Sequence, residues 1–283
     1  MSVNAGSKPI VTDKLIHVYD PLSPVSYPSG SETFRNHFSE AHVKKVTNGF
    51  GTNSDNGTDI GFAKNGLAEY GAETDHQRQK GYFEADGTSD HWEWLTSDGT
   101  RFPVRGGTTG GNYPASISFG GWFKFYPQST TRYIFGYGST SSSYGYSYVR
   151  MSSNGTLDWY HEPGSTAASL NGSSVDMEDS TWHYIMCVVE GASSSTQDLD
   201  FYIDGGLIDH QSSGGNSVGS NSYVGSNTTY TRYYNIGSVR TSSSSANSSS
   251  HYGQIGPHHF YAKALTKEEC QQNYYAQIDR FNF

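Results

Sequence analysis

The sequence predicts an all-β protein, and three observations point to this class. Aromatic residues make up 14% of the 283 residues, and 22 residues are Tyr; aromatic side chains are enriched in strands. Glycine contributes 33 residues while charged residues reach only 16%, as expected for strands joined by polar turns. Short segments with alternating apolar positions recur through the second half of the chain. A β-sandwich of this length can form a single domain.

The clearest strand is the segment ISFGGWFKF. Its alternating positions place one set of residues on a single face, namely Ile117, Phe119, Gly121, Phe123 and Phe125. We expect this face to line the core. The segments RYIFGYG, YGYSYVRM and GTLDWYHE follow at the spacing of a meander, so each is predicted to be a further strand.

Two later segments define the middle of the predicted sheet. WHYIMCVVEG is apolar on both faces, which predicts a central strand. LDFYIDGGLID places Leu199, Phe201 and Ile203 on one face. The residues 204–206 after them, Asp-Gly-Gly, predict a hairpin turn.

The two ends of the chain carry weaker patterns. IVTDKLIHVYD predicts a first strand, and residues 20–80 are irregular. GYFEADGTSDHWEWL predicts two strands around a turn at Asp86 and Gly87. Near the end, Thr266 is followed three residues later by Glu269, which matches a capping box and predicts a short helix.

Charge and composition disfavour several classes of partner. The net charge of −9 repels phosphate backbones, so nucleic acid is not expected. No stretch approaches the roughly 18 apolar residues of a membrane helix, so no membrane partner is expected. No apolar run follows a basic start, so export by a signal peptide is not expected either. The two cysteines, Cys187 and Cys270, are expected to be free thiols because no dense cysteine framework exists.

Several segments resemble one family, in the same order. WHYIMCVVEG resembles the pattern WhhvavtydG, DFYIDGGLI resembles lYvDGklv, and GQIGPHHFYAKALTKEECQQNYYAQIDRF resembles G.I.dv.iYnRALs.eEi.qnYna...rf. These patterns belong to the laminin-G-like, or concanavalin-A-like lectin and glucanase, jelly roll. The resemblance implies an antiparallel β-sandwich jelly roll with a short C-terminal helix. We expect an N-terminal arm at residues 1–9 and one domain at residues 10–283.

The early part of the chain resembles a subgroup found among virion structural proteins of tailed phages. LIHVYDPLSPVSYPSGSETFRN resembles LvlhlDa.np.SYpgsGttw.D, and YFEADGTSDHWEW resembles f.fDGtdDyi. The resemblance implies a non-enzymatic protein on the virion surface, assembled in the host cytoplasm, as capsid decoration or as a tail or fibre component. The implied partners are the major capsid protein or tail proteins, and host-surface glycans. Residues 1–30 are the expected docking segment, and homo-oligomers stay open because sheet edges and loops can support them.

Two other functions remain as alternatives. One is a carbohydrate-binding lectin module that is not part of a virion. The other is a glycan-cleaving enzyme, which needs paired carboxylates across the scissile bond. Glucanases of this fold resemble one another in a strand carrying Glu-x-Asp-x-(x)-Glu, and this sequence contains no such triplet. We therefore expect no enzymatic activity.

Loops rich in Tyr, Ser, Gly and Asn form the candidate carbohydrate-binding surface. Tyr gives rigid amphipathic contact area, and aromatic faces suit sugar rings. The candidate residues are Tyr144, Tyr146, Tyr148, Trp159, Tyr230, Tyr233 and Tyr234. Among the tryptophans, Trp159 is expected to be exposed, whereas the interior is assigned Trp92, Trp94, Trp122 and Trp182. The alternative is that the tyrosines are core residues and the loops are simply solvated.

Calcium is a second possibility that the resemblance raises. The family often binds it through the turn that here contains Asp86 and Asp90, and through a second pair of aspartates. That second pair falls on Gly256 and Pro257, so half of the ligands are missing. The alternative is that Asp86 only fixes its turn. We expect no cofactor, with calcium at Asp86 and Asp90 kept as the alternative.

The adjacent histidines His258 and His259 lie in the last predicted strand. His258 falls where the family has an apolar core residue, and His259 is expected to point the opposite way because strand side chains alternate. The pair is therefore not expected to hold one metal ion together. A buried, hydrogen-bonded His258 is the leading interpretation, with a site or metal-ligand role left open.

Overall fold

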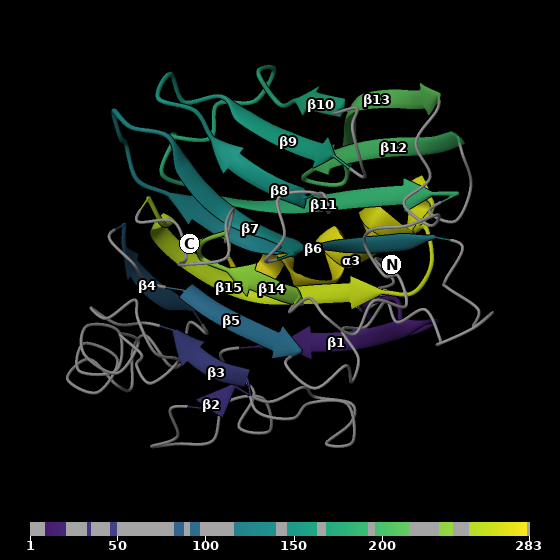
Figure 1. The fold of residues 1–283 in the computed structure, drawn as a ribbon, viewed down its shortest axis with the longest axis horizontal. Coiled ribbons are helices and arrows are strands. Elements are labelled where there is room, and N and C mark those ends of the chain that lie inside the picture. Colours follow the sequence, from purple (N-terminus) through teal and green to yellow (C-terminus); the bar gives the residue numbers. More distant parts are fainter. Residues whose placement is uncertain are drawn as a thin grey trace, which may run out of the picture.

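The protein is an antiparallel β-sandwich, which confirms the predicted jelly roll (Figure 1). The computed structural model describes residues 9–20, 33–34, 46–49, 82–87, 91–96, 116–139, 146–162, 168–191, 196–214, 232–239 and 249–281. Within these residues the strands form two sheets, and a short helix lies near the C-terminal end. No helix in these ranges is long and apolar enough to cross a membrane.

The seven-stranded sheet contains the most strongly apolar strands. Its order is β1 (Leu15–Tyr19), β15 (Tyr252–Tyr261), β6 (Ile117–Phe125), β11 (Trp182–Glu190), β12 (Thr196–Ile203) and β13 (Gly206–Gly214), with β4 (Phe83–Asp86) also pairing with β15. As predicted from its apolar sequence, β11 is central and pairs with both β6 and β12.

The eight-stranded sheet faces it. Its order is β10 (Ala168–Asn171), β9 (Leu157–Glu162), β8 (Tyr146–Met151), β7 (Arg132–Ser139), β14 (Arg232–Ile236), β5 (His91–Thr96), β3 (Val46–Gly49) and β2 (Thr33–Phe34). The strands β4 and β5 are close in sequence, and the Asp-Gly turn suggested that they flank a turn as partners. They do not pair, because β4 joins β15 while β5 joins β14 and β3. The segment between them therefore crosses from one sheet to the other.

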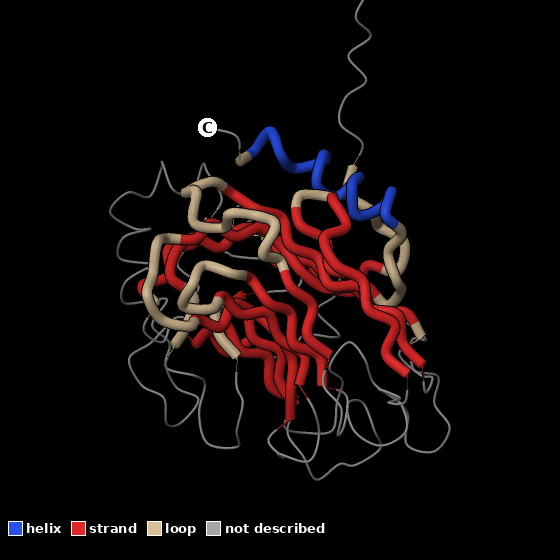
Figure 2. Tube along the Cα trace, turned by 90° about the horizontal axis from the view of Figure 1, so that it is seen from above, coloured by secondary structure: helices blue, strands red, loops and turns tan. Residues whose placement is uncertain are grey.

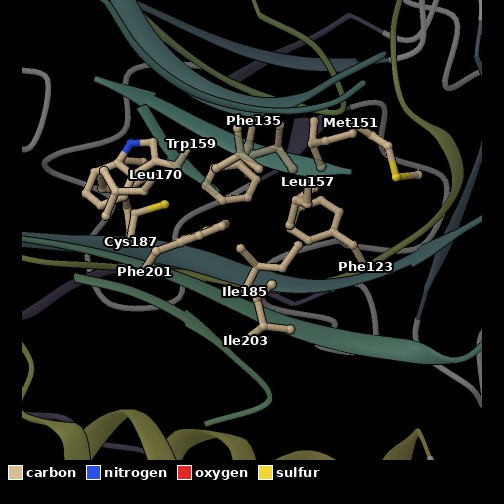
Figure 3. Close-up of a cluster of buried hydrophobic side chains, with 14 of the residues drawn as sticks. Phe123, Phe135, Met151, Leu157, Trp159, Leu170, Ile185, Cys187, Phe201 and Ile203 are labelled. Atoms are coloured by element: carbon tan, nitrogen blue, oxygen red, sulfur yellow. The ribbon is translucent and has the colours of Figure 1, made fainter. Parts of the chain in front are cut away.

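The main hydrophobic core lies between the two sheets (Figure 3). The alternating residues of β6 that were predicted to face inward line this core. Phe119 lies among them and has no exposed surface. Its ring contacts four aromatic rings of the opposite sheet and, in its own sheet, that of Phe260; the four are Phe135, Tyr137, Trp159 and Tyr234. Burying one such side chain contributes about 1.5–3 kcal/mol. The predicted inward face of Leu199, Phe201 and Ile203 is confirmed as well.

A second apolar layer covers the opposite face of the seven-stranded sheet. The helix α3 (Lys267–Gln277) and the 3-10 turn η3 (Ile278–Arg280) pack there, on one side of all the strands (Figure 2). Trp122 is buried in this layer, where its ring stacks on those of Tyr274 and Phe281. The expected burial of Trp122 is confirmed, but its neighbours are the helix and not the other sheet, because it alternates with Phe123.

The predicted capping box begins this helix. Thr266 accepts from the backbone N–H of Glu269, and the Glu269 side chain accepts from the backbone N–H of Thr266.

The cysteines lie on opposite faces of the same sheet: Cys187 is in the inter-sheet core and Cys270 is in the helix layer. Both are buried and free, as the sequence predicted. Trp182 is half-buried beside this layer, and the side chains of Trp92 and Trp94 lie outside the described part.

The first described residues are fastened to the chain's own C-terminal helix. The backbone N–H of Val11 donates to Oδ1 of Asn273 over 2.8 Å. The hydroxyl of Tyr261 donates to the carbonyl of Val11, and Arg280 forms a two-pronged ion pair with Asp20. Residues 9–20 are therefore packed on the sandwich itself, and docking of other proteins by residues 1–30 stays a prediction.

Candidate functional site

The structure separates the predicted carbohydrate-binding residues. Tyr144 and Tyr230 lie outside the described residues. Tyr146 and Tyr233 belong to β8 and β14, but their side chains are not among the described ones. For these four tyrosines a role in binding stays a prediction from the sequence.

Trp159 is not at the surface. It lies in β9 with no exposed area, its ring packs against Phe119 and Phe201, and its Nε1–H donates to the hydroxyl of Ser147 over 2.9 Å. The expectation that Trp159 is exposed is therefore wrong. Its neighbours Leu157 and His161 also point inward, so the whole alternating set belongs to the core.

Tyr234 is also an interior residue. It is 3% exposed, lies in β14, and its hydroxyl is hydrogen-bonded to Nε2 of His258. His258 is 1% exposed and packs against Phe123 and Phe135, which agrees with the leading interpretation of this histidine. His259 points to the helix layer, where its Nδ1 lies 3.4 Å from the hydroxyl of Tyr184.

Of the three predicted residues whose side chains are described, Tyr148 is the one that lies on the outer face of a sheet. Its neighbour Val149 faces the core, so alternation turns Tyr148 to the outer face of the eight-stranded sheet. Its ring stacks on that of Tyr160 in β9, with ring centroids 5.1 Å apart. On its other side it meets the ring of Tyr133 in β7 edge-on, at 5.4 Å. These three residues are called the tyrosine ladder below.

Exposure is unequal along the tyrosine ladder. Tyr148 is 9% exposed and sits in the middle, while Tyr133 and Tyr160 are half-buried on either side. The flanking rings therefore offer the accessible aromatic surface, and Tyr148 supports them. Aromatic rings combine a broad apolar surface with a polar hydroxyl, which suits contacts to partly polar ligands.

A polar cluster lies beside the ladder. Asp158 of β9 is its centre: Oδ2 accepts from the hydroxyl of Ser152 over 2.8 Å, and Oδ1 accepts from Nδ2 of Asn171 over 3.1 Å. Nε of Arg150 lies 3.6 Å from Oδ2 of Asp158. The polar cluster is defined as Arg150, Ser152, Asp158 and Asn171.

Strand register explains why these side chains meet. Tyr133 pairs with Arg150, Arg150 pairs with Asp158, and Asp158 pairs with Asn171, which forms one row across β7, β8, β9 and β10. Tyr148 and Tyr160 form the next row. Four adjacent strands span about 14 Å, since strands lie roughly 4.8 Å apart. These strands lie side by side at one end of the sheet (Figure 1).

The two outer faces of the sandwich differ in what covers them. The seven-stranded sheet is covered by α3 and residues 9–15, whereas no helix of the described part of the chain lies on the eight-stranded sheet (Figure 2). Ser169 and Asn171 of β10 are exposed there. The outer face of β7 to β10 is the candidate binding face.

The sequence interpretation missed Tyr133, Tyr160 and Arg150. A usable signal was present, because the polar residues 152–156 between β8 and β9 form a tight turn, in which the backbone N–H of Ser152 donates to the carbonyl of Thr156. Counting outward from that turn pairs Arg150 with Asp158, and Tyr148 with Tyr160. Both pairs then fall on the face opposite Trp159.

The calcium prediction falls largely outside the described residues. Asp86 ends β4, where its backbone pairs with Tyr252, but its side chain is not described, and Asp90 is not described at all. Among the described residues, no group of three or more His, Cys, Asp and Glu side chains is arranged to hold a metal ion. Calcium binding at Asp86 and Asp90 stays a prediction.

One row of hydrogen-bonded polar side chains contains residue types found in hydrolase sites. It is buried, so it is not accessible as such a site is. His161 joins Ser147 through Nδ1 at 3.0 Å and Gln197 through Nε2 at 3.0 Å. All three residues are at most 1% exposed. Burial lowers the pKa of His161 to about 4, although the hydrogen bond to Gln197 opposes this shift. The chain of hydrogen bonds satisfies buried polar groups inside the core, where a substrate has no entry.

Comparison with known proteins shows the fold. No protein-family model matches the sequence, and no curated protein sequence matches it either. Trypanosoma rangeli sialidase, solved as a covalent intermediate with 2,3-difluorosialic acid, is similar over 99% of this chain and 38% of its own, with 10% identity and a TM-score of 0.52. This similarity covers the whole sandwich but little more than a third of the sialidase.

Two other solved structures are similar over shorter parts. A pentraxin from Limulus polyphemus matches 56% of this chain and 68% of its own, with 15% identity and a TM-score of 0.41. The binding domain of botulinum neurotoxin serotype D, in complex with N-acetylneuraminic acid, matches 70% of this chain and 42% of its own, with 14% identity and a TM-score of 0.43. At these identities the sequences have diverged too far to transfer a site.

Proposed function

We propose that this chain is a non-catalytic glycan-binding β-sandwich whose ligand lies on the outer face of β7, β8, β9 and β10. One observation carries the proposal: the tyrosine ladder and the polar cluster lie together on the same face, with Tyr148 and Tyr160 in one row and Tyr133 beside Arg150 in the next. A sugar ring needs an apolar surface for its C–H face and nearby donors and acceptors for its hydroxyl groups. This face supplies both within four strands.

The polar cluster is held ready for such hydroxyl groups. Asp158 is fixed by Ser152 and Asn171, so little conformational freedom is lost when a ligand binds. Asn171 is itself fixed, because its backbone N–H donates to Oδ2 of Asp209 over 2.9 Å. The face therefore combines preorganised polar groups with rigid rings.

The absence of catalysis is part of the proposal. Asp158 is the carboxylate at the centre of the face, and its two oxygens accept hydrogen bonds from Ser152 and Asn171. Glycoside hydrolysis needs two carboxyl groups, either about 5 Å or about 6.5–9.5 Å apart, that flank the scissile bond. Asp158 instead serves to organise its neighbours. Release of reducing sugar from mixed polysaccharides would contradict this part of the proposal.

A glycan screen tests the binding proposal. The fluorescently labelled chain is applied to an array of immobilised oligosaccharides, alongside the variant Tyr160→Ala. We expect the wild-type chain to bind a defined subset and Tyr160→Ala to lose at least about tenfold in affinity, since removal of a stacked ring costs roughly 1.5 kcal/mol. Tyr275→Ala is the matched control, because Tyr275 is 61% exposed but lies on α3. Equal binding by all three proteins would contradict the proposed face.

The second part of the proposal concerns where the protein is located. We place this glycan-binding sandwich on the surface of a tailed-phage particle, as capsid decoration or as a tail or fibre component that meets host-surface glycans. The support is the resemblance of the early sequence to phage virion proteins. Quantitative mass spectrometry of purified particles tests it, with hundreds of copies expected for capsid decoration and a few tens for a tail or fibre. Absence from the particle leaves a lectin that acts outside any virion.

A further inference from the structure

Arg150 is the unusual member of the candidate face. It belongs to the polar cluster, its side chain is 34% exposed, and among the described residues its ion-pair partner is Asp158. The 3.6 Å between Nε of Arg150 and Oδ2 of Asp158 is too long for a hydrogen bond. Nε itself is buried and has no hydrogen-bond partner. The guanidinium group thus has donors that no described residue satisfies.

The register places Arg150 between Asp158 of β9 and Tyr133 of β7. Asp158 lies next to the buried Nε, on the β9 side of Arg150. The exposed part of the side chain is therefore the part beyond Nε, which carries the planar pair of terminal nitrogens. On its β7 side Arg150 is paired with Tyr133. Arg150 therefore lies in the same row as one residue of the tyrosine ladder.

A planar fork of N–H donors matches a carboxylate, which can accept two parallel hydrogen bonds from it. We propose that the candidate face selects a carboxylated saccharide, with the sugar carboxylate on Arg150 and the pyranose ring against the tyrosine ladder. This inference rests on the proposed glycan-binding function and names the class of glycan.

The charges around Arg150 are compatible with such a ligand. Among the described residues Asp158 is the carboxylate paired with Arg150, and both of its oxygens already accept hydrogen bonds, Oδ2 from Ser152 and Oδ1 from Asn171. Asp209 accepts from the backbone of Asn171, still farther from Tyr133. Tyr133, the other neighbour of Arg150 in this row, carries no charge that would repel a carboxylate. The net charge of −9 opposes long polyanions, so short saccharides with one acidic group are the expected ligands.

Matched ligands test the inference. The probes are oligosaccharides of glucuronate, galacturonate and mannuronate, and sialyllactose, each with a counterpart in which the carboxyl group is reduced to an alcohol. Calorimetric titration should show that at least one acidic form binds about tenfold more tightly than its reduced counterpart, because charge-assisted bonds are about twice as strong as neutral ones. This preference should shrink as the salt concentration rises, since the ion pair is partly exposed.

Variants at Arg150 assign the preference to this residue. Arg150→Gln should abolish the preference, so that the acidic and the reduced form bind with equal affinity. Arg150→Lys should keep part of the preference, because lysine retains the charge but not the fork. Binding of the reduced form that persists in Arg150→Gln also shows that the variant is folded.

The outcomes separate the two proposals. Equal affinity for acidic and reduced forms, with both lost in Tyr160→Ala, overturns the carboxylate inference and keeps the glycan-binding function. A preference for the acidic form that survives in Arg150→Gln also overturns the inference, since another residue then reads the carboxylate. No binding of any acidic or neutral saccharide overturns both.

Discussion

Val11 and Asn273 lie 262 positions apart, yet the backbone N–H of Val11 donates to Oδ1 of Asn273 over 2.8 Å. Nδ2 of the same amide donates to the hydroxyl of Tyr261 over 2.9 Å, and that hydroxyl donates to the carbonyl of Val11. Asn273 has no exposed surface. One buried amide therefore joins the first described segment, the last strand and the helix.

Replacing Asn273 tests the strength of this junction. Asn273→Ala leaves the N–H of Val11 without its acceptor in a buried setting, and each such group costs about 1–3 kcal/mol. We expect the free energy of unfolding to fall by about 2–4 kcal/mol, measured by urea denaturation. Gln272→Ala is the neighbouring control, because Gln272 makes one exposed hydrogen bond, to the carbonyl of Pro9. An equal effect of both substitutions would contradict this account.

His183 makes the hairpin turn after β12 sensitive to pH. Its Nδ1 lies 2.8 Å from Oδ2 of Asp204, and its Nε2 lies 3.2 Å from Oδ1 of Asp179. Asp204 has a φ of +54°, which asparagine also tolerates. Burial favours a lower pKa for His183, but the hydrogen bond and charge of Asp204, helped by Asp179, raise the pKa above its usual value.

The sign of the pH effect follows from that raised pKa. The protonated form of His183 is favoured in the folded state, so its stabilisation is complete below about pH 6.5 and is lost as the pH rises through the raised folded pKa. Asp204→Asn removes the charge and should lower the free energy of unfolding by about 1–2 kcal/mol at pH 5.5 but less at pH 8.5. Urea titrations at the two pH values measure this. A larger loss at pH 8.5 would reverse the proposed sign.

Four other buried histidines act in the opposite direction. Burial lowers the pKa of His161, His251 and His259 to about 4, and lowers that of His258 well below its usual value. In the unfolded chain a histidine takes up a proton near pH 6.5. Stability is therefore lost as the pH falls from about 6.5 toward 4, by up to about 1.4 kcal/mol per pH unit for each histidine that stays neutral.

A double substitution isolates one of these histidines. Tyr234→Phe with His258→Phe replaces both hydrogen-bond partners by apolar rings of similar shape, which can be close to neutral at pH 7. The free energy of unfolding should then fall less steeply between pH 6.5 and 4.5, because the variant takes up about one proton fewer on unfolding. Thermal or urea denaturation across this range gives the slope. An unchanged slope would mean that His258 does not contribute to acid sensitivity.

The sequence was informative wherever a short pattern determines a structure. Alternation placed Phe119 and Phe123 in the core, the Asp204–Gly205 turn follows β12, and Thr266 with Glu269 begins the helix. Each of these depends on residues close together in the chain. The all-β class and the sandwich follow from the same kind of local evidence.

The candidate site depended on contacts between strands, which local patterns do not give. Tyr148 was named from its loop composition, but its partners Tyr133 and Tyr160 follow only from the register of three strands. Trp159 was assigned to the surface because a hairpin was expected to expose it. Alternation with Asp158 puts it instead in the core, where its ring meets Phe119.

The central claim is that a glycan lies on the tyrosine ladder, and ring-labelled tyrosine NMR tests it most directly. Ring signals of the labelled chain are recorded with and without a saturating amount of the best-binding oligosaccharide from the array, and assigned by single Tyr→Phe variants. We predict that the signals of Tyr133 and Tyr160 shift most, while those of Tyr252 and Tyr275, which are exposed on β15 and α3, stay in place. Shifts at Tyr252 or Tyr275 with an unmoved tyrosine ladder would contradict the account.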